Sequence, residues 1–169
     1  MKLYHGSTVE VREPKILTLV NCLDFGAAFY ITSSFNQALS WSKTKAHRRK
    51  IGRPTVSIYE FDERNAFQTL KVKEFFEPTE EWLDFVVAQR SRRYRGEKFD
   101  LIIGPVADDQ AITVLDKHIA GQYPPKMALE LLEPQNLVVQ YAFTTIKALS
   151  YLKCIGVENG GVNEWMLIN

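Results

Sequence analysis

Alternating hydrophobic and polar positions predict a series of short strands along the chain. β-Branched and aromatic residues gather in these segments, which suits a pleated and half-buried surface. The stretch FDLIIGPVA is apolar throughout, so it is expected to form a strand buried on both faces. The predicted strands cover residues 2–5, 8–12, 25–32, 55–62, 70–75, 99–107 and 136–145, and a loop is expected over 14–24.

Helical spacing separates these strands. Ser34 followed by Gln37 is a capping-box pattern, which predicts a helix that starts there and ends near Lys50. Apolar positions at i, i+3, i+4 and i+7 predict a second helix over 82–92, with its stripe packed in the core. Further helices are expected from Asp108–Asp109 to Gly121, over 124–132, and briefly before residue 152, and the following GVENGGVNEW is expected to be a loop.

The order of these elements lacks the regular βαβ rhythm of a parallel sheet, so it predicts an α+β fold. The length of 169 residues suits one domain with its own core, and residues 1–169 are therefore expected to form a single domain. No apolar run approaches the roughly 20 residues of a membrane span. A strand-like segment at residue 3 leaves no room for a signal peptide, which indicates a cytoplasmic protein.

Charge and cysteine content narrow the functional classes. The net charge is +1, from 21 basic and 20 acidic residues, so no global field draws the chain to nucleic acid or to anionic lipid. Cys22 and Cys154 lack partners at metal-ligand spacing. We therefore expect two reduced thiols, no metal and no membrane partner.

Three stretches of the sequence combine into one pattern. His5-Gly6 lies at the end of the first predicted strand, and FGAAFYIT leads into a helix that carries Trp41 eleven residues after Tyr30. A late strand carries Gln140 followed by Tyr141. This order and spacing resembles the ADP-ribosyltransferase superfamily, in particular the branch of the poly(ADP-ribose) polymerases with its His-Tyr-Glu signature.

The whole chain also resembles a bacterial, DUF3990-like family of uncharacterised domains in that superfamily. The resemblance implies a split mixed β-sheet core with flanking helices. The motifs that carry it are YHGS (Tyr4–Ser7), DFG with FY (Asp24–Tyr30), W-x-D-F-V (Trp82–Val86), GPVADD (Gly104–Asp109) and QY (Gln140–Tyr141).

The resemblance assigns roles in binding NAD, which would be the substrate. His5 would hold the adenosine-side ribose, and the backbone of Gly6 would hydrogen-bond the nicotinamide carboxamide. Tyr30 and Trp41 would sandwich the nicotinamide ring. Ala38 stands where the polymerases often carry a serine that contacts the carboxamide, and Ser7 is the candidate to replace that serine.

Gln140 stands where the polymerases have a catalytic glutamate. An amide orients a ribose hydroxyl but carries no charge to stabilise an oxocarbenium-like transition state. The expectation is therefore transfer of a single ADP-ribose to a protein or nucleic-acid acceptor, with Asp109, or Asp108, as the replacement carboxylate. The family further suggests a toxin-like effector with a small neutralising partner protein.

Two other functions remain open: a catalytically inactive relative that binds NAD or ADP-ribose, and a basic nucleic-acid-binding module. The basic segments 43–53 and 90–95 are either solvated faces or sites for the NAD pyrophosphate or a polyanionic acceptor. Each site residue also has a structural explanation. His5 can be a strand histidine, Tyr30 and Trp41 core aromatics, Gln140 an exposed strand residue, and Asp108 and Asp109 the start of a helix.

Overall fold

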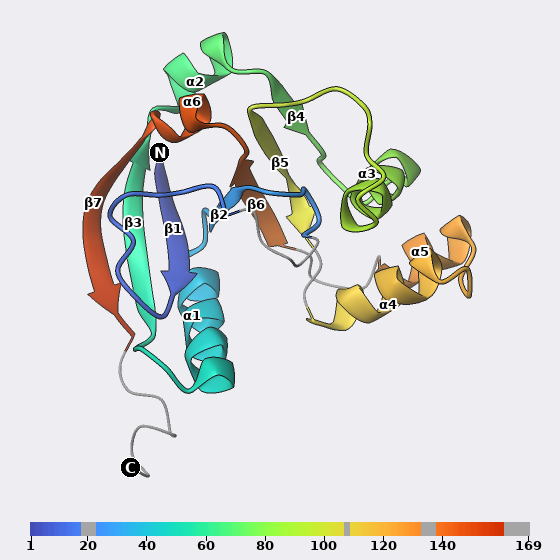
Figure 1. The fold of residues 1–169 in the computed structure, drawn as a ribbon, viewed down its shortest axis with the longest axis horizontal. Coiled ribbons are helices and arrows are strands. Elements are labelled where there is room, and N and C mark those ends of the chain that lie inside the picture. Colours follow the sequence, from blue (N-terminus) through green and yellow to red (C-terminus); the bar gives the residue numbers. More distant parts are fainter. Residues whose placement is uncertain (18–22, 107–108, 133–137, 161–169) are drawn as a thin grey trace. The chain divides into compact units, whose positions relative to one another are not determined.

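The structure is a computed structural model that describes residues 1–17, 23–106, 109–132 and 138–160. This part of the chain contains a mixed seven-stranded sheet, in the order β4-β5-β6-β2-β1-β3-β7, together with six helices (Figure 1), which confirms the predicted α+β class. The elements in chain order are β1 (Lys2–Ser7), β2 (Phe29–Thr32), α1 (Phe35–Arg49), β3 (Thr55–Phe61), α2 (Glu63–Thr69), β4 (Val72–Glu74), α3 (Glu80–Arg90), β5 (Leu101–Val106), α4 (Asp109–Ile119), α5 (Pro125–Leu132), β6 (Val138–Phe143), α6 (Ile146–Leu149) and β7 (Leu152–Asn159).

The chain divides into two compact units, and each is described by itself. Unit 1 comprises Met1–Lys15, Tyr30–Leu70 and Ile146–Asn169, and unit 2 comprises Ile16–Phe29 and Lys71–Thr145. None of the helices in the described ranges is long and apolar enough to cross a membrane.

In unit 1, β3 lies between two antiparallel neighbours. It pairs with β1 from Lys2↔Glu60 to Ser7↔Thr55, and with β7 along its whole length. The loop predicted over GVENGGVNEW (156–165) is therefore wrong at its start, because Leu152–Asn159 is a strand, and the short helix predicted through Leu152 ends at Leu149. The sequence of β7 does not alternate regularly, and the ladder to β3 contains an irregularity between Ile58 and Tyr59. Pairing with a neighbour, rather than local pattern, makes this segment a strand.

The strand predicted over residues 8–12 is also wrong, because β1 ends at Ser7 and a loop follows. Two side chains of β3 hydrogen-bond the main chain of this loop, in place of the backbone hydrogen bonds that a strand would make. The N–H of Val11 donates to Oγ of Ser57 at 3.0 Å, and Oη of Tyr59 donates to the carbonyl of Val11. Burial raises the pKa of the Tyr59 hydroxyl, which keeps it protonated and able to donate.

Helix α1 begins and ends as predicted. Oγ of Ser34 caps it by accepting from the N–H of Gln37 at 3.3 Å, and Lys50 ends it in the left-handed conformation. In a capping box, the side chain of Gln37 would accept from the backbone N–H of Ser34, and this bond is not formed. The Gln37 side chain accepts instead from Oγ1 of Thr32 at 2.6 Å, which ties the helix start to the end of β2.

α1 packs closely against β1 and β3. Its buried residues are small and spaced one turn apart: Ala38, Ser42 and Ala46. A Cβ atom on Gly6 of β1 would lie 2.0 Å from the carbonyl oxygen of Ala38. Gly6 therefore permits a contact between strand and helix backbone that no other residue allows.

Unit 2 is built around β5, which is buried at every position as predicted. β4 runs parallel to β5, and β6 runs antiparallel to it. The stripe of α3 lies in this core, with Trp82 and Val86 completely buried. The indole Nε1–H of Trp82 donates to the carbonyl of Pro105 at 2.9 Å, which joins the W-x-D-F-V and GPVADD motifs.

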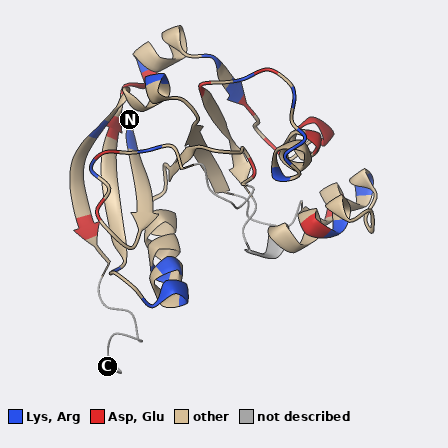
Figure 2. Ribbon diagram, in the orientation of Figure 1, with Lys and Arg blue, Asp and Glu red and all other residues tan. Residues whose placement is uncertain are grey.

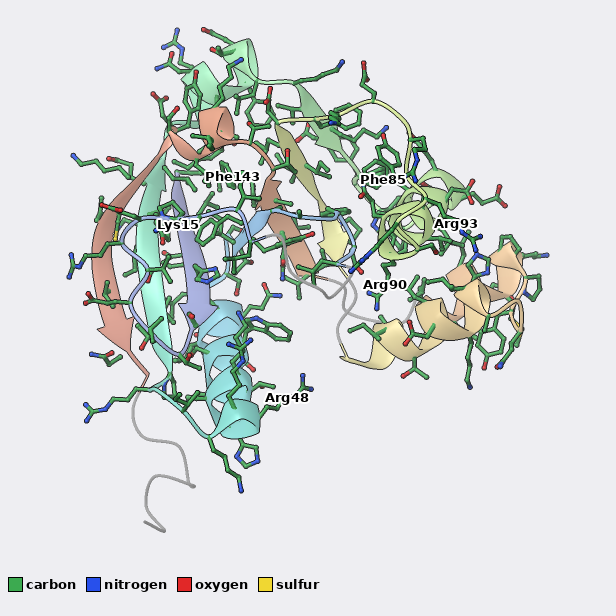
Figure 3. All side chains as sticks on the ribbon, viewed as in Figure 1. Lys15, Arg48, Phe85, Arg90, Arg93 and Phe143 are labelled. Carbon is green, nitrogen blue, oxygen red and sulfur yellow. The ribbon has the colours of Figure 1, made fainter. Side chains whose placement is uncertain are left out.

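The DFG motif is part of the same core, so the strand predicted over 25–32 begins only at Phe29. Phe25 packs beside Phe75 and Phe85, with ring centroids 6.2 and 6.3 Å away. Nη1 of Arg90 lies 2.5 Å from Oδ1 of Asp24, which is 5% exposed. Figure 3 shows the side chains of Phe85 and Arg90 on α3. These motifs therefore have a packing role within unit 2.

Candidate functional site

His5 lies on β1 and is half-buried. Its Nδ1 lies 2.7 Å from the carbonyl oxygen of Tyr30 on β2. Because a carbonyl only accepts, Nδ1 carries the proton and the neutral ring keeps its lone pair on Nε2. Burial, and to a smaller extent the positive charge of Lys45, lower the pKa of His5 to about 4. The hydrogen bond to Tyr30 raises this pKa but does not outweigh them. At neutral pH, His5 is therefore an uncharged acceptor at Nε2.

Stability should depend on this histidine in acid. Between pH 6.5 and about pH 4 the unfolded chain binds the His5 proton and the folded chain does not, so the free energy of unfolding falls as the pH is lowered. We expect a loss of about 1–3 kcal/mol from this group. Urea unfolding at pH 7 and pH 4.5 measures it, and His5→Gln should show a smaller loss than the wild type and the exposed-site control His47→Gln. An equal loss in all three proteins would contradict the prediction.

Gly6 lies at a strand edge where the sheet pairing of β1 and β2 has ended. These two strands pair at Tyr4↔Thr32 only. The carbonyl oxygen of Gly6 accepts from Nζ of Lys45 at 3.1 Å, so this oxygen faces a side chain of α1 and not a neighbouring strand. A main-chain carbonyl at an unpaired strand edge is a suitable acceptor for a ligand amide.

The register determines which residues share a face. Side chains alternate along a strand and paired residues face the same way, so Tyr30 and Thr32 of β2 lie on the face of Tyr4 and Gly6. This is the face that α1 covers, because Gly6 contacts Ala38 there. His5 is on the opposite face and reaches the main chain of Tyr30 at the strand edge.

Trp41 is on α1, and 42% of its surface is exposed. Core packing therefore does not account for this tryptophan. Its ring centroid lies 5.4 Å from Nζ of Lys45. Tyr30 is half-buried. The structure thus brings Gly6, Tyr30 and Trp41 to the α1 side of unit 1.

The other predicted site residues that the structure describes do not lie on the α1 side of unit 1. Ser7 is half-buried on β1, on the same face as His5 and away from α1. In unit 2, Gln140 is half-buried on β6 opposite Gly104, and Asp109 is the first residue of α4. Asp108 lies outside the described residues. The roles predicted for Ser7, Gln140 and Asp109 in binding or chemistry stay predictions.

Sequence reasoning missed Lys45, which contacts both Gly6 and Trp41. This lysine is part of a basic run that complements the negative end of the helix dipole, and Figure 2 shows the basic residues along the C-terminal half of α1. The sequence feature that could have identified Lys45 is its position four residues after Trp41. This spacing of one helical turn puts both side chains on the same flank of α1.

No group of three or more His, Cys, Asp or Glu residues in the described ranges is arranged to hold a metal ion. Cys154 is free and half-buried, and Cys22 lies outside the described residues.

Comparison with known proteins shows the family. A family model described as "Protein of unknown function (DUF3990)" matches residues 1–154. No curated protein matches the chain, and no solved structure does.

Proposed function

The chain belongs to the DUF3990 family of proteins of unknown function, and we propose that it is an NAD-dependent mono-ADP-ribosyltransferase. It would cleave the bond between nicotinamide and ribose and transfer ADP-ribose to a macromolecular acceptor. The observation that supports this most is the strand edge in unit 1. The Gly6 carbonyl, Tyr30 and Trp41 share its α1 side, and His5 reaches the Tyr30 backbone there.

The nicotinamide end of NAD is a flat cation with a carboxamide. The Gly6 carbonyl would accept from the carboxamide N–H, and the rings of Tyr30 and Trp41 would contact the charged pyridinium face. That β1 and β2 pair at a single position supports a split sheet of the ADP-ribosyltransferase type. Nicotinamide is already a good leaving group, so holding it in position is the main requirement.

The adenosine end would meet His5. With the proton on Nδ1, a ribose hydroxyl would donate to Nε2, the ring nitrogen that carries no proton in this tautomer. Because the pKa of His5 is lowered to about 4, the ring stays uncharged throughout the neutral range.

The transfer step needs an acceptor nucleophile. The C1′–N bond to nicotinamide breaks, a bond from C1′ to the nucleophile forms, and the proton of the nucleophile goes to solvent or to a base. The resemblance gives Gln140 the role of orienting the nicotinamide-ribose hydroxyl and Asp109 the role of the carboxylate, and both residues belong to unit 2. An amide in place of glutamate favours a single transfer over chain elongation. The acceptor is a protein or a nucleic acid, and a toxin-like role with a neutralising partner belongs to the same proposal.

The test is release of nicotinamide from isotopically labelled NAD. We expect His5→Ala, Tyr30→Ala and Trp41→Ala each to lower the rate at least about tenfold, because each removes a hydrogen bond or a ring contact. His47→Ala is the matched control, since His47 is exposed on α1 and has no place in the site.

Further variants test unit 2. Gln140→Ala with unchanged turnover would remove Gln140 from the proposal, and Asp109→Asn with full activity would leave Asp109 only its place at the start of α4. Equal release by wild type, His5→Ala and Tyr30→Ala would contradict the proposed site as a whole.

A second candidate is a catalytically inactive relative that binds NAD or ADP-ribose, and Gln140 in place of the glutamate favours it. Saturable binding of NAD without release of nicotinamide would identify this case. Binding of random oligonucleotides with a steep salt dependence, unaffected by His5→Ala, would instead indicate a nucleic-acid-binding module.

A further inference from the structure

Lys45 holds two of the groups that the proposed function assigns to nicotinamide. Its ammonium donates to the carbonyl of Gly6 at 3.1 Å. The same Nζ lies 5.4 Å from the centroid of the Trp41 ring. One positive charge thus contacts both the carbonyl and the aromatic face.

The surroundings of Lys45 do not neutralise its charge. The side chain is half-buried, and in the part of the chain that the structure describes no carboxylate forms an ion pair with it. Arg49, one turn further along α1, adds a second positive charge. A half-buried cation held only by a carbonyl and a ring has weaker compensation than one paired with a carboxylate.

These two contacts match the chemistry of the nicotinamide group. Nicotinamide in NAD is a cation that favours an aromatic face, and its carboxamide carries an N–H donor that suits a carbonyl. We propose that Lys45 is an internal competitor for the nicotinamide end of NAD: its ammonium occupies the Gly6 carbonyl and the Trp41 face, and it leaves when NAD binds. This inference rests on the proposed function.

The side chain of Lys45 can readily move away from the Gly6 carbonyl and the Trp41 ring. This side chain is long and flexible, and the ammonium regains full hydration when it moves into water. Burial, and next the nearby charge of Arg49, lower the pKa of Lys45 to about 8, which reflects an ammonium that is poorly stabilised where it lies. Lys45 therefore weakens NAD binding without closing the site.

Calorimetric titration of the full-length protein with NAD tests the proposal. Lys45→Met keeps a long side chain but removes the charge and the donor, and we expect it to bind NAD about tenfold more tightly than wild type. Lys45→Arg keeps both properties and should bind as weakly as wild type. Lys43→Met is the matched control, because Lys43 is an exposed lysine of the same helix. Thermal unfolding of each variant, followed by circular dichroism, verifies that it is folded.

A second measurement follows Lys45 itself. Acylation of lysines by an amine-reactive ester, read by mass spectrometry, should increase at Lys45 when NAD is saturating and should not change at Lys43. Protection of Lys45 by NAD would mean that the lysine contacts the bound ligand and is not displaced by it.

The outcomes separate the two proposals. NAD binding with equal or weaker affinity in Lys45→Met, or protection of Lys45, overturns the competitor and leaves the proposed function standing. NAD binding by Lys45→Met alone supports the competitor. Absence of NAD binding in wild type, Lys45→Met and Lys45→Arg alike overturns both.

Discussion

Gly6→Ala is expected to lower the free energy of unfolding by about 3 kcal/mol. The new methyl group would lie 2.0 Å from the carbonyl oxygen of Ala38 and 3.1 Å from the backbone nitrogen of Ser42. Both atoms belong to the helix backbone, so no side-chain rotation relieves the overlap and α1 has to move away from β1. Urea unfolding followed by circular dichroism measures the change.

Gly156→Ala is the matched control in the same unit. A Cβ there would meet only Cδ1 of Ile58, at 3.8 Å, which is ordinary contact. We expect a change within about 0.5 kcal/mol. If the two variants were equally stable, the close approach of α1 to Gly6 would be wrong.

Arg90→Met is expected to cost about 3–5 kcal/mol, because it removes the positive partner of a buried carboxylate. Asp24 is 5% exposed, and its Oδ1 lies 2.5 Å from Nη1 of Arg90. The second arm of the guanidinium is 3.6 Å from Oδ1 of Asp116, which is well exposed and adds little. The midpoint of urea unfolding, compared with that of wild type, gives the loss.

The exposed pair of Lys71 and Glu97 provides the control for this ion pair. Their side chains are 50% and 58% exposed, so Glu97→Gln should cost less than about 1 kcal/mol. The double variant Asp24→Asn with Arg90→Met should lose less than the sum of its single variants, since both single variants remove the same ion pair. Strict additivity would show that Asp24 and Arg90 do not interact.

Elements with a strong local signal were predictable from the sequence. The cap at Ser34, the stripe that begins at Trp82 and the continuous apolar run of β5 each determine an element without help from distant residues. Helix α2 was missed, although Asp62 caps it by accepting from the N–H of Asn65. Its seven residues make it too short for a clear apolar stripe.

Elements that depend on distant partners were not predictable. β7 is a strand because β3 pairs with it across about 100 residues of sequence, and the loop at Val11 is held by side chains of Ser57 and Tyr59. Strand pairing is set by contacts remote in sequence, so neither local propensity nor pattern reveals it. The strand predicted over 25–32 starts late, at Phe29, for the same reason, because Phe25 packs in the core of unit 2.

The candidate site was predictable only as a set of motifs. The resemblance assigned the backbone of Gly6 to the nicotinamide carboxamide, but α1 fills the space where a Cβ of Gly6 would lie. The part of Gly6 that remains suited to a ligand is its carbonyl. Lys45 was hidden in a basic run that the helix dipole already explains, and only the three-dimensional arrangement singles it out.

The indole of Trp82 is fully buried and bonded to Pro105, whereas Trp41 is 42% exposed on α1. Emission from Trp82 should therefore be blue-shifted and shielded from iodide, and emission from Trp41 red-shifted and readily quenched. Trp165, the third tryptophan, lies outside the described residues, and Trp165→Phe removes its signal. The protein then carries one natural optical reporter in each unit, so a single fluorescence experiment can follow whether the two units melt together or in sequence.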